Sequence, residues 1–236
     1  MLLADTTIVF DLDGTLIDTA PDLIAAADHA LVQANYERSE AERLRPWISF
    51  GARRMIVEAL AMQNATATGT QLDTLHDVFL THYEANIAAS SRPFAGAVPL
   101  LYALKQDGAT LAICTNKREQ LATSLLSQLG LKSLFKAVVG RDTLPVCKPD
   151  PAHLLQTIAR ANGSPTQAIM IGDSKTDVDT ARNAGVPVIG VTFGYTDTPM
   201  AQLAPDRLIA SFGEALQAIT DLVQQQRANP NTQSNA

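Results

Sequence analysis

The chain has 236 residues, a net charge of −6 and a hydrophobic fraction of 46%. This length and composition allow a substantial buried core, in one large domain or in two smaller ones. Charges of both signs are interspersed along an acidic chain, which argues against a nucleic-acid-binding protein, because such proteins usually carry a basic stripe. No apolar run approaches the roughly 18 residues that span a bilayer, so no membrane partner is expected.

The termini and the cysteines predict the compartment. The N-terminus has neither a basic start nor a cleavable apolar stretch, so we expect no signal peptide. Cys114 and Cys147 are the only cysteines, and free thiols in a reducing cytoplasm explain them more simply than a disulfide does. The polar residues 226–236 are expected to form a flexible tail.

The first predicted strand, Thr7–Phe10, leads directly into the sequence Asp-Leu-Asp-Gly-Thr, with carboxylates at Asp11 and Asp13. A short apolar strand of this kind is buried until its last residue, so the acids lie at the sheet edge where open α/β folds bind ligands. In an extended chain their two side chains point the same way. Like charges so close repel each other, and the pair therefore predicts a metal, a shared proton or both.

Residues 19–91 contain no convincing strand pattern. Four helical patterns fill this segment, at Asp22–Ala34, Glu40–Arg45, Arg53–Met62 and Leu72–Ala88. They predict a small α-helical cap domain inserted into a catalytic core made of residues 1–18 and 92–225. The hinges are expected near Asp18–Ala20 and Ser90–Pro93.

The rest of the chain alternates between strands and helices. Strands are predicted at Thr110–Cys114, Ala137–Val139, Ala168–Ile171 and Val188–Val191. Helices are predicted at Leu100–Gln106, Glu119–Leu129, Ala152–Ala161 and Thr176–Ala184, and a glycine soon follows each, as it commonly does at helix ends. This alternation predicts an α/β fold, a doubly wound parallel sheet with a Rossmann-like core.

Polar residues follow other predicted strands as they follow the first. Thr115 and Asn116 come after one strand, Asp173 and Asp177 after another, and Lys148 lies in the loop before a helix. Because parallel strands end at the same edge of a sheet, these distant residues are expected to converge. Each alone has a simpler explanation, but the combination is much less expected by chance.

The simpler explanations are specific. Thr115 and Asp173 stand where helix N-caps belong, and Ser, Thr and Asp accept backbone N–H bonds there. Lys148 could be a solvated loop lysine, and Asp177 could be a first-turn acid favoured by the helix dipole.

Charge balance favours a metal at the predicted edge. The aspartates would bring four negative charges together, of which Lys148 offsets one and a hard divalent ion two. Carboxylate and carbonyl oxygens without nearby His or Cys suit Mg²⁺, which also binds substrate phosphate. The histidines show no metal-ligand spacing, so zinc is a poor fit.

These motifs together resemble the four ordered motifs of the haloacid dehalogenase superfamily, over nearly the whole chain. The resemblance rests on Asp-Leu-Asp-Gly-Thr from Asp11, on Thr115-Asn116, on Lys148-Pro149 and on Gly172-Asp173 with Asp177. Within the superfamily, the segments 18–23, 48–53 and 190–195 look most like phosphoglycolate phosphatases. The resemblance therefore implies a phosphatase acting on a small phosphorylated metabolite, with 2-phosphoglycolate the leading substrate.

The resemblance also implies roles in catalysis. Asp11 would attack phosphorus and form an aspartyl-phosphate. Asp13 would protonate the leaving oxygen and then deprotonate the water that cleaves the intermediate. Thr115, Asn116 and Lys148 would bind the phosphate, with Lys148 also neutralising charge.

The implied metal is Mg²⁺. Its ligands would be Asp11, the backbone carbonyl of Asp13, and Asp173. Asp177 would hold the metal site or Lys148 in place.

The cap is expected to recognise the rest of the substrate. Arg53, at a loop-to-helix transition, could grip a small carboxylate, although paired arginines at a helix start are usually solvated. The same two interpretations apply to Lys117 and Arg118, and whether they or Arg54 touch substrate stays open.

Other functions remain alternatives to the phosphoglycolate phosphatase. One is another small phosphatase, for an amino-sugar or sugar 6-phosphate, and another is a phosphosugar mutase, which also keeps both acids. The dehalogenase branch lacks the second acid, so Asp13 argues against that chemistry. A signalling module with a phosphoacceptor aspartate is disfavoured by length and by the helical insert. A monomer and a homodimer are both compatible with the sequence.

Overall fold

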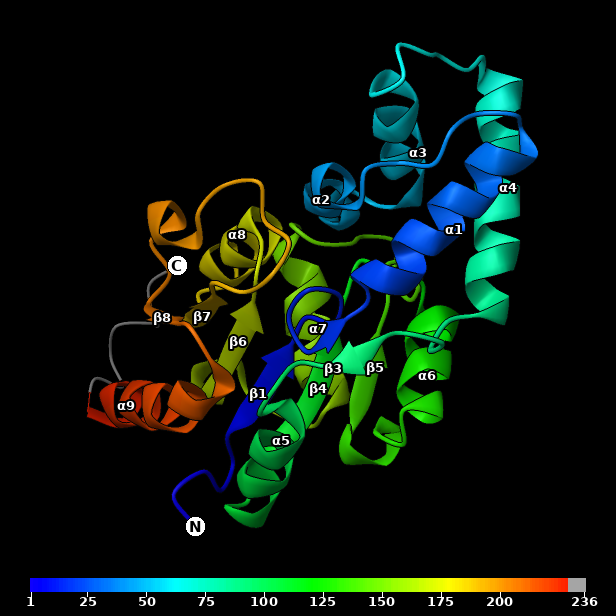
Figure 1. Ribbon diagram of the computed structural model, residues 1–236. Helices are drawn as coiled ribbons and strands as arrows, with labels where there is room; N and C mark the ends of the chain where they lie inside the picture. The colour runs from blue at the N-terminus through cyan, green and yellow to red at the C-terminus, as the bar shows by residue number, and fades with distance from the viewer. Residues whose placement is uncertain (229–236) are drawn as a thin grey trace.

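In the computed structural model, which describes residues 1–228, a six-stranded parallel sheet forms the core. Its order is β5-β4-β1-β6-β7-β8 (Figure 1). The strands are β1 Thr7–Phe10, β4 Thr110–Cys114, β5 Ala137–Val139, β6 Ala168–Gly172, β7 Val188–Val191 and β8 Arg207–Ile209. The apolar β1 is central, with Ile8 level with Leu111 on one side and Ile169 on the other. The predicted doubly wound α/β fold is thus confirmed.

Helices cover both faces of the sheet because strand side chains alternate between them. Ile8 and Phe10 of β1 belong to the core shared with α5 Ala97–Gln106, α6 Glu119–Gln128 and α9 Ala215–Ala228. Val9 points to the opposite face, and its neighbours there come from two other helices. Those helices are α7 Pro151–Arg160 and α8 Lys175–Asn183.

The five predicted strands match the observed ones within one residue, whereas β8 and the two short strands at residues 17–18 and 92–93 are not among the predicted strands. The apolar-run criterion passed over β8 because it has three residues, begins with an arginine and exposes its central leucine. Such a short edge strand pairs with only one neighbour, β7, and needs no apolar run to be stable there.

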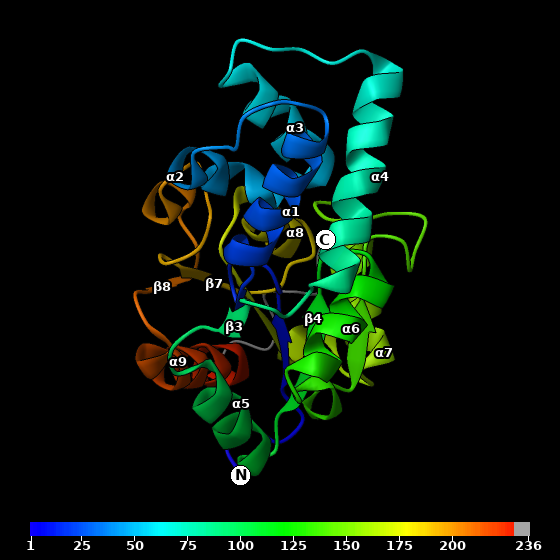
Figure 2. The same ribbon diagram turned by 45° about the vertical axis from the view of Figure 1, so that its right-hand side comes forward.

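A second layer of helices lies over the carboxyl ends of the strands (Figures 1 and 2). It contains α1 Ala20–Gln33, α2 Ala41–Leu44, the 3₁₀ segment Arg45–Phe50, α3 Ala52–Ala61 and α4 Gly69–Ala85. The last helix predicted for this layer, Leu72–Ala88, is shifted by three residues toward the C-terminus relative to the observed α4. Its true start is set by a capping box, in which Thr68 and Gln71 bond each other's backbone N–H. We propose 19–91 as the bounds of this cap.

Two chain segments join the cap to the core. They form a small antiparallel pair, β2 Ile17–Asp18 and β3 Arg92–Pro93. The buried Asp22 carboxylate ties them further, because it accepts hydrogen bonds from the backbone N–H groups of Ser90 and Ser91 at 2.7–3.0 Å. The two connections thus enter the cap side by side.

The C-terminal prediction is tested only in part. Residues 226–228 complete α9, so this part of the predicted flexible tail is helical. Residues 229–236 lie outside the described residues. None of the helices within residues 1–228 combines the length and the apolar character that a membrane crossing requires.

Candidate active site

The sheet topology brings the predicted polar residues to one edge. Asp11 follows β1, Thr115 follows β4 and Asp173 follows β6, three strands that are adjacent and parallel. The backbone ladder continues past the strand ends, since the Asp11 N–H donates to the Ile171 carbonyl at 2.9 Å. The positions of these side chains are therefore fixed by strand pairing.

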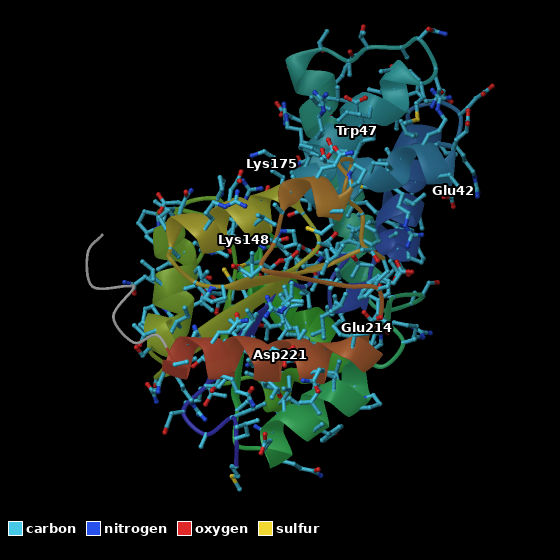
Figure 3. All side chains as sticks on the ribbon, turned by 90° about the vertical axis from the view of Figure 1, so that its left-hand side faces the viewer. Glu42, Trp47, Lys148, Lys175, Glu214 and Asp221 are labelled. Atoms are coloured by element: carbon cyan, nitrogen blue, oxygen red, sulfur yellow. The ribbon has the colours of Figure 1, made fainter. Side chains whose placement is uncertain are left out.

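Lys148 lies at the centre of the acidic edge. Its ammonium pairs with Asp11 at 2.8 Å and with Asp177 at 2.6 Å, and its side chain is 3% exposed. Figure 3 shows it within the molecule, whereas Lys175 is at the surface. Burial alone would lower the pKa of Lys148, but the Asp11 and Asp177 carboxylates outweigh this effect and raise it. Lys148 is a buried cation, so the solvated-loop interpretation is wrong.

Asp173 is held by hydrogen bonds on both carboxylate oxygens. Thr15 Oγ1 donates to Oδ1 at 2.7 Å, and the backbone N–H of Tyr195 donates to Oδ2 at 2.8 Å. Gly14 lies against this carboxylate with φ +83°, and a Cβ there would come within 2.5 Å of Asp173 Oδ2. Only glycine accommodates both the backbone conformation and the close approach.

The helix-cap interpretations of Thr115 and Asp173 are wrong. The N-caps of the following helices are Arg118 for α6 and Ser174 for α8, so neither residue is used to cap its helix. Thr115 Oγ1 instead accepts the Lys117 N–H at 3.1 Å, which shapes the turn after β4.

Asp177 both caps a helix and pairs with Lys148. It forms the capping box of α8, in which its Oδ2 accepts the Ser174 N–H at 3.1 Å, and its Oδ1 accepts from Lys148. The first-turn position that the helix dipole favours is therefore also a position that orients the buried lysine.

Asp11, Asp173 and Asp177 form a set of oxygens that fits a divalent cation. One ligand atom from each lies within 4.8 Å of the others, and the set contains neither His nor Cys. Burial raises the pKa of Asp11 to about 7 and that of Asp173 to about 8, with the neighbouring Asp177 adding to both. Carboxylates that are this difficult to ionise together suit a hard cation such as Mg²⁺.

These raised pKa values predict a pH-dependent stability in metal-free protein. Between about pH 4 and pH 8 the folded protein binds more protons at Asp11 and Asp173 than the unfolded chain does. The free energy of unfolding should therefore fall as pH rises through this window. Urea unfolding at pH 5, 6, 7 and 8 in chelator measures the slope. In 10 mM Mg²⁺ the slope should flatten, and a slope that Mg²⁺ leaves unchanged would contradict a cation at these carboxylates.

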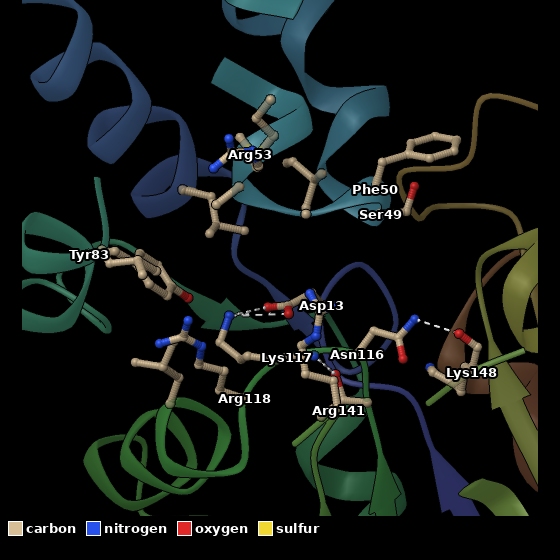
Figure 4. Close-up of a pocket in the computed structure, with 18 of the residues that line it drawn as sticks. Asp13, Ser49, Phe50, Arg53, Tyr83, Asn116, Lys117, Arg118, Arg141 and Lys148 are labelled. Atoms are coloured by element: carbon tan, nitrogen blue, oxygen red, sulfur yellow. Dashed lines mark hydrogen bonds and ion pairs between the residues drawn. The ribbon is translucent and has the colours of Figure 1, made fainter. Parts of the chain in front are cut away.

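Asp13 faces away from the Lys148 cluster. Its carboxylate pairs with the Lys117 ammonium at 2.9 and 3.1 Å, as Figure 4 shows. Burial alone would lower the pKa of Lys117, but Asp13 and the neighbouring Tyr83 raise it. Lys117 therefore stays charged and is not a solvated surface lysine.

The other candidate residues lie around one cavity of about 710 Å³ between core and cap. Asn116 and Arg118 line it from the core, and the Asn116 amide donates to the Lys148 carbonyl at 3.1 Å. Arg53 lines it from the cap, although its guanidinium pairs with Asp73 at 2.6 Å. Arg54 instead pairs with Glu58 and lies over the ring of Trp47.

Two residues that contact the site residues were not predicted: Thr15, which bonds Asp173, and Tyr83, which lies beside Lys117. Thr15 belongs to the first motif, where its neighbouring acids drew attention away from its hydroxyl. Tyr83 lies near the end of α4, 1% exposed, with its ring centroid 4.5 Å from the Lys117 ammonium. An aromatic residue in an amphipathic helix is normally a packing residue, so the sequence holds no signal for its place beside Lys117.

Comparisons with known proteins agree with this geometry. Residues 8–191 match the family model of the haloacid dehalogenase-like hydrolases. The phosphoglycolate phosphatase of Agrobacterium fabrum is 45% identical over 89% of this chain and 91% of its own length. That of Mesorhizobium japonicum is 43% identical over 87% of this chain and 90% of its own. A crystal structure from Haemophilus somnus, described as a predicted phosphoglycolate phosphatase, superimposes with a TM-score of 0.84 at 30% identity, covering 92% of this chain and 98% of that one.

Proposed function

This chain belongs to the haloacid dehalogenase-like hydrolase family, and from that premise we propose that this phosphatase converts 2-phosphoglycolate to glycolate and phosphate. The observation that carries the proposal is the buried Asp11 carboxylate, paired with Lys148 at the cavity between core and cap. The names of the relatives support the substrate. A reducing cytoplasm is the proposed location, and it suits the free thiols of Cys114 and Cys147.

The first half of the proposed reaction transfers the phosphoryl group to the enzyme. An Asp11 oxygen attacks phosphorus, a bond from that oxygen to phosphorus forms, and the bond from phosphorus to the ester oxygen breaks. Asp13 gives its proton to the departing oxygen, which leaves as the hydroxyl of glycolate. The two acids follow one short strand two residues apart, and we propose that Asp13, which pairs with Lys117 in this structure, turns toward the ester bond at Asp11.

The second half returns Asp11 to its starting state. Asp13, now a carboxylate, takes a proton from water as the water oxygen attacks phosphorus. The bond from phosphorus to the Asp11 oxygen breaks, and inorganic phosphate leaves. Asp13 therefore donates a proton in the first half and accepts one in the second, so it is protonated again at the end of the cycle.

Lys148, Thr115 and Asn116 are proposed to hold the phosphate. The Lys148 ammonium reaches Asp11 at 2.8 Å, so a phosphoryl group on Asp11 would also lie beside it. Thr115 is buried at the end of β4, and its hydroxyl is an additional donor at the same edge. Charge on the phosphoryl oxygens is stabilised strongly there, because the Lys148 ammonium and the Thr115 hydroxyl are already in position and are largely shielded from water.

We propose that Mg²⁺ binds to Asp11, Asp173 and the backbone carbonyl of Asp13. When bound, the ion neutralises charge on these carboxylates and on the phosphate. Asp177 is proposed to position Lys148, because one of its oxygens accepts from Lys148 and the other from the Ser174 N–H.

Metal removal should abolish activity reversibly. We expect phosphate release to fall by at least about 100-fold in excess chelator, since the clustered carboxylates would otherwise repel the phosphate. Excess Mg²⁺ should restore it, whereas Ca²⁺, which prefers more ligands at longer distances, should not. Full activity after exhaustive chelation, with metal content verified by atomic spectroscopy, would exclude the metal from the mechanism.

A substrate panel tests the proposed reaction itself. With Mg²⁺ present, 2-phosphoglycolate, an amino-sugar 6-phosphate and glucose 6-phosphate are each assayed for free phosphate and for isomerised product. The proposal predicts phosphate release with the highest kcat/KM for 2-phosphoglycolate. Isomerised sugar phosphate without free phosphate would instead identify a mutase.

A further inference from the structure

The cavity contains a buried cation whose role the proposed chemistry leaves open. The Lys117 side chain is 5% exposed, comes from the loop after β4, and faces the cap. Tyr83 approaches it from cap helix α4, with its hydroxyl directed toward the ammonium and Asp13 (Figure 4). Core and cap therefore each contribute one polar group to the same part of the cavity.

Among residues 1–228, no group accepts a hydrogen bond from the buried Tyr83 hydroxyl; its polar neighbour there is the Lys117 ammonium, which is itself a donor. Burial raises the pKa of this phenol to about 12, so at neutral pH it remains a hydrogen-bond donor. A buried donor without an acceptor carries an unfavourable desolvation cost, which a bound acceptor would remove. The unsatisfied hydroxyl therefore marks a position for an acceptor atom of a ligand.

The surrounding charges favour an anionic acceptor. Arg53, Arg118 and Arg141 line the same cavity as Lys117. His76, on the cavity-facing side of α4, has its pKa lowered by burial and then by the positive charges of Arg118 and Arg53. Apart from Asp11 and Lys148, the cavity lining therefore contains four cationic side chains against the two carboxylates of Asp13 and Asp142.

We infer that Lys117 and Tyr83 bind a carboxylate on the substrate, separately from the phosphate site at Asp11. This inference rests on the proposed function and defines the substrate class as phosphate monoesters with a carboxylate near the ester oxygen. Lys117 is 2.9 Å from Asp13, the residue proposed to protonate that oxygen. This short separation matches a molecule in which one carbon joins the ester oxygen to the carboxylate group.

Arg53 is the competing receptor for the same carboxylate. Its side chain is 49% exposed and paired with Asp73, which is itself 63% exposed. Exposed ion pairs contribute little because water screens them, whereas a hydrogen bond to a buried ammonium is much stronger. Both cations are already paired, Lys117 with Asp13 and Arg53 with Asp73, but only the Lys117 side chain is buried, so it is the better placed cation and Arg53 serves as the comparison in the test.

The test compares two substrates of nearly the same shape, 2-phosphoglycolate and its neutral amide. The ratio of their kcat/KM values isolates recognition of the carboxylate, because any general damage to catalysis affects both substrates. Lys117→Met should lower this ratio by roughly 10- to 100-fold, and Tyr83→Phe by roughly 10-fold, as expected for hydrogen bonds to a charged group. Lys136→Met, which removes an exposed lysine at the opposite edge of the sheet, should keep the wild-type ratio.

Three results would overturn the inference. The wild type could show no preference for the carboxylate, or Lys117→Met and Tyr83→Phe could slow both substrates equally. The third is a ratio that falls in Arg53→Met and persists in Lys117→Met, which would assign the carboxylate to Arg53. In each case, phosphate release by the wild type that is lost in Asp11→Asn would still support the proposed phosphatase chemistry, so a failure of this inference can be distinguished from a failure of that chemistry.

Discussion

Asp11→Asn should reduce phosphate release by at least about 10⁴-fold, because an amide cannot form the covalent bond to phosphorus that the carboxylate forms. The substitution keeps the shape of the side chain. It removes a carboxylate whose negative charge is already disfavoured, because burial raises the pKa of Asp11. The fold should therefore persist, with a melting temperature within a few degrees of the wild type. Phosphate release with Mg²⁺ and 2-phosphoglycolate, together with thermal unfolding, measures both effects.

Asp179→Asn is the matched control for this variant. Like Asp11→Asn, it replaces one carboxylate by an amide. Asp179 lies on α8, its side chain is 30% exposed, and it pairs with the surface residue Lys175. It should retain nearly full activity. Activity of Asp11→Asn above about one hundredth of the wild-type rate, in protein shown by mass spectrometry to be free of deamidation, would remove Asp11 from the nucleophilic role.

A trapping experiment extends the same prediction. If Asp11 carries the phosphoryl group, rapid acid quenching during turnover should yield protein that is one phosphoryl group heavier, and Asp11→Asn should yield none. A phosphorylated Asp11 that persists for hours without hydrolysis would instead favour a signalling module, the function that the length and the cap disfavour.

The sequence predicts the sheet well for a physical reason. Strands buried on both faces must be apolar throughout, so β1, β4, β5 and β7 appear as runs with clear ends. The same rule fails for β8, which needs only one partner. It also fails for β2 and β3, which have two residues each. These strands form where the two connections to the cap lie side by side, and no apolar pattern marks them.

The meeting of the site residues follows from topology alone. Once the sheet is parallel, the residues after β1, β4 and β6 must share an edge, and Asp11, Thr115 and Asp173 do. Their individual partners do not follow in this way. The contact of Asp13 with Lys117 and that of Asp173 with the Tyr195 backbone depend on loop conformations, which no residue pattern encodes.

Tyr195 shows how such a loop can connect the site to the cap. Its backbone N–H holds Asp173, and its hydroxyl accepts the Ala20 N–H at 2.9 Å and donates to Asp18 at the first hinge. Arg45 of the cap lies over the same ring and pairs with Asp18 at 3.3 Å. The position of the cap and the geometry of the acidic edge therefore depend on the same residue, Tyr195.

Lys148→Met should be the most damaging substitution for the site as a whole. Within residues 1–228, Lys148 is the one lysine or arginine that pairs with Asp11 or Asp177. Its loss leaves buried carboxylates without their cation, which typically costs about 3–5 kcal/mol of stability. Activity should fall by at least about 10³-fold, because charge on the attacked phosphate is no longer offset. Lys175→Met removes an exposed lysine and should change neither property appreciably.

The pH dependence of this variant separates a specific electrostatic role from general damage to packing. Without the ammonium the pKa of Asp11 rises further, so the folded variant holds its proton to higher pH while the unfolded chain does not. Its free energy of unfolding should approach that of the wild type near pH 4 and fall more steeply as pH rises toward 8. Mg²⁺ should recover part of the loss, since a cation at Asp11 and Asp173 offsets the same charge. A loss of stability that is equal at all pH values and indifferent to Mg²⁺ would instead mean that Lys148 acts through the packing of its aliphatic chain.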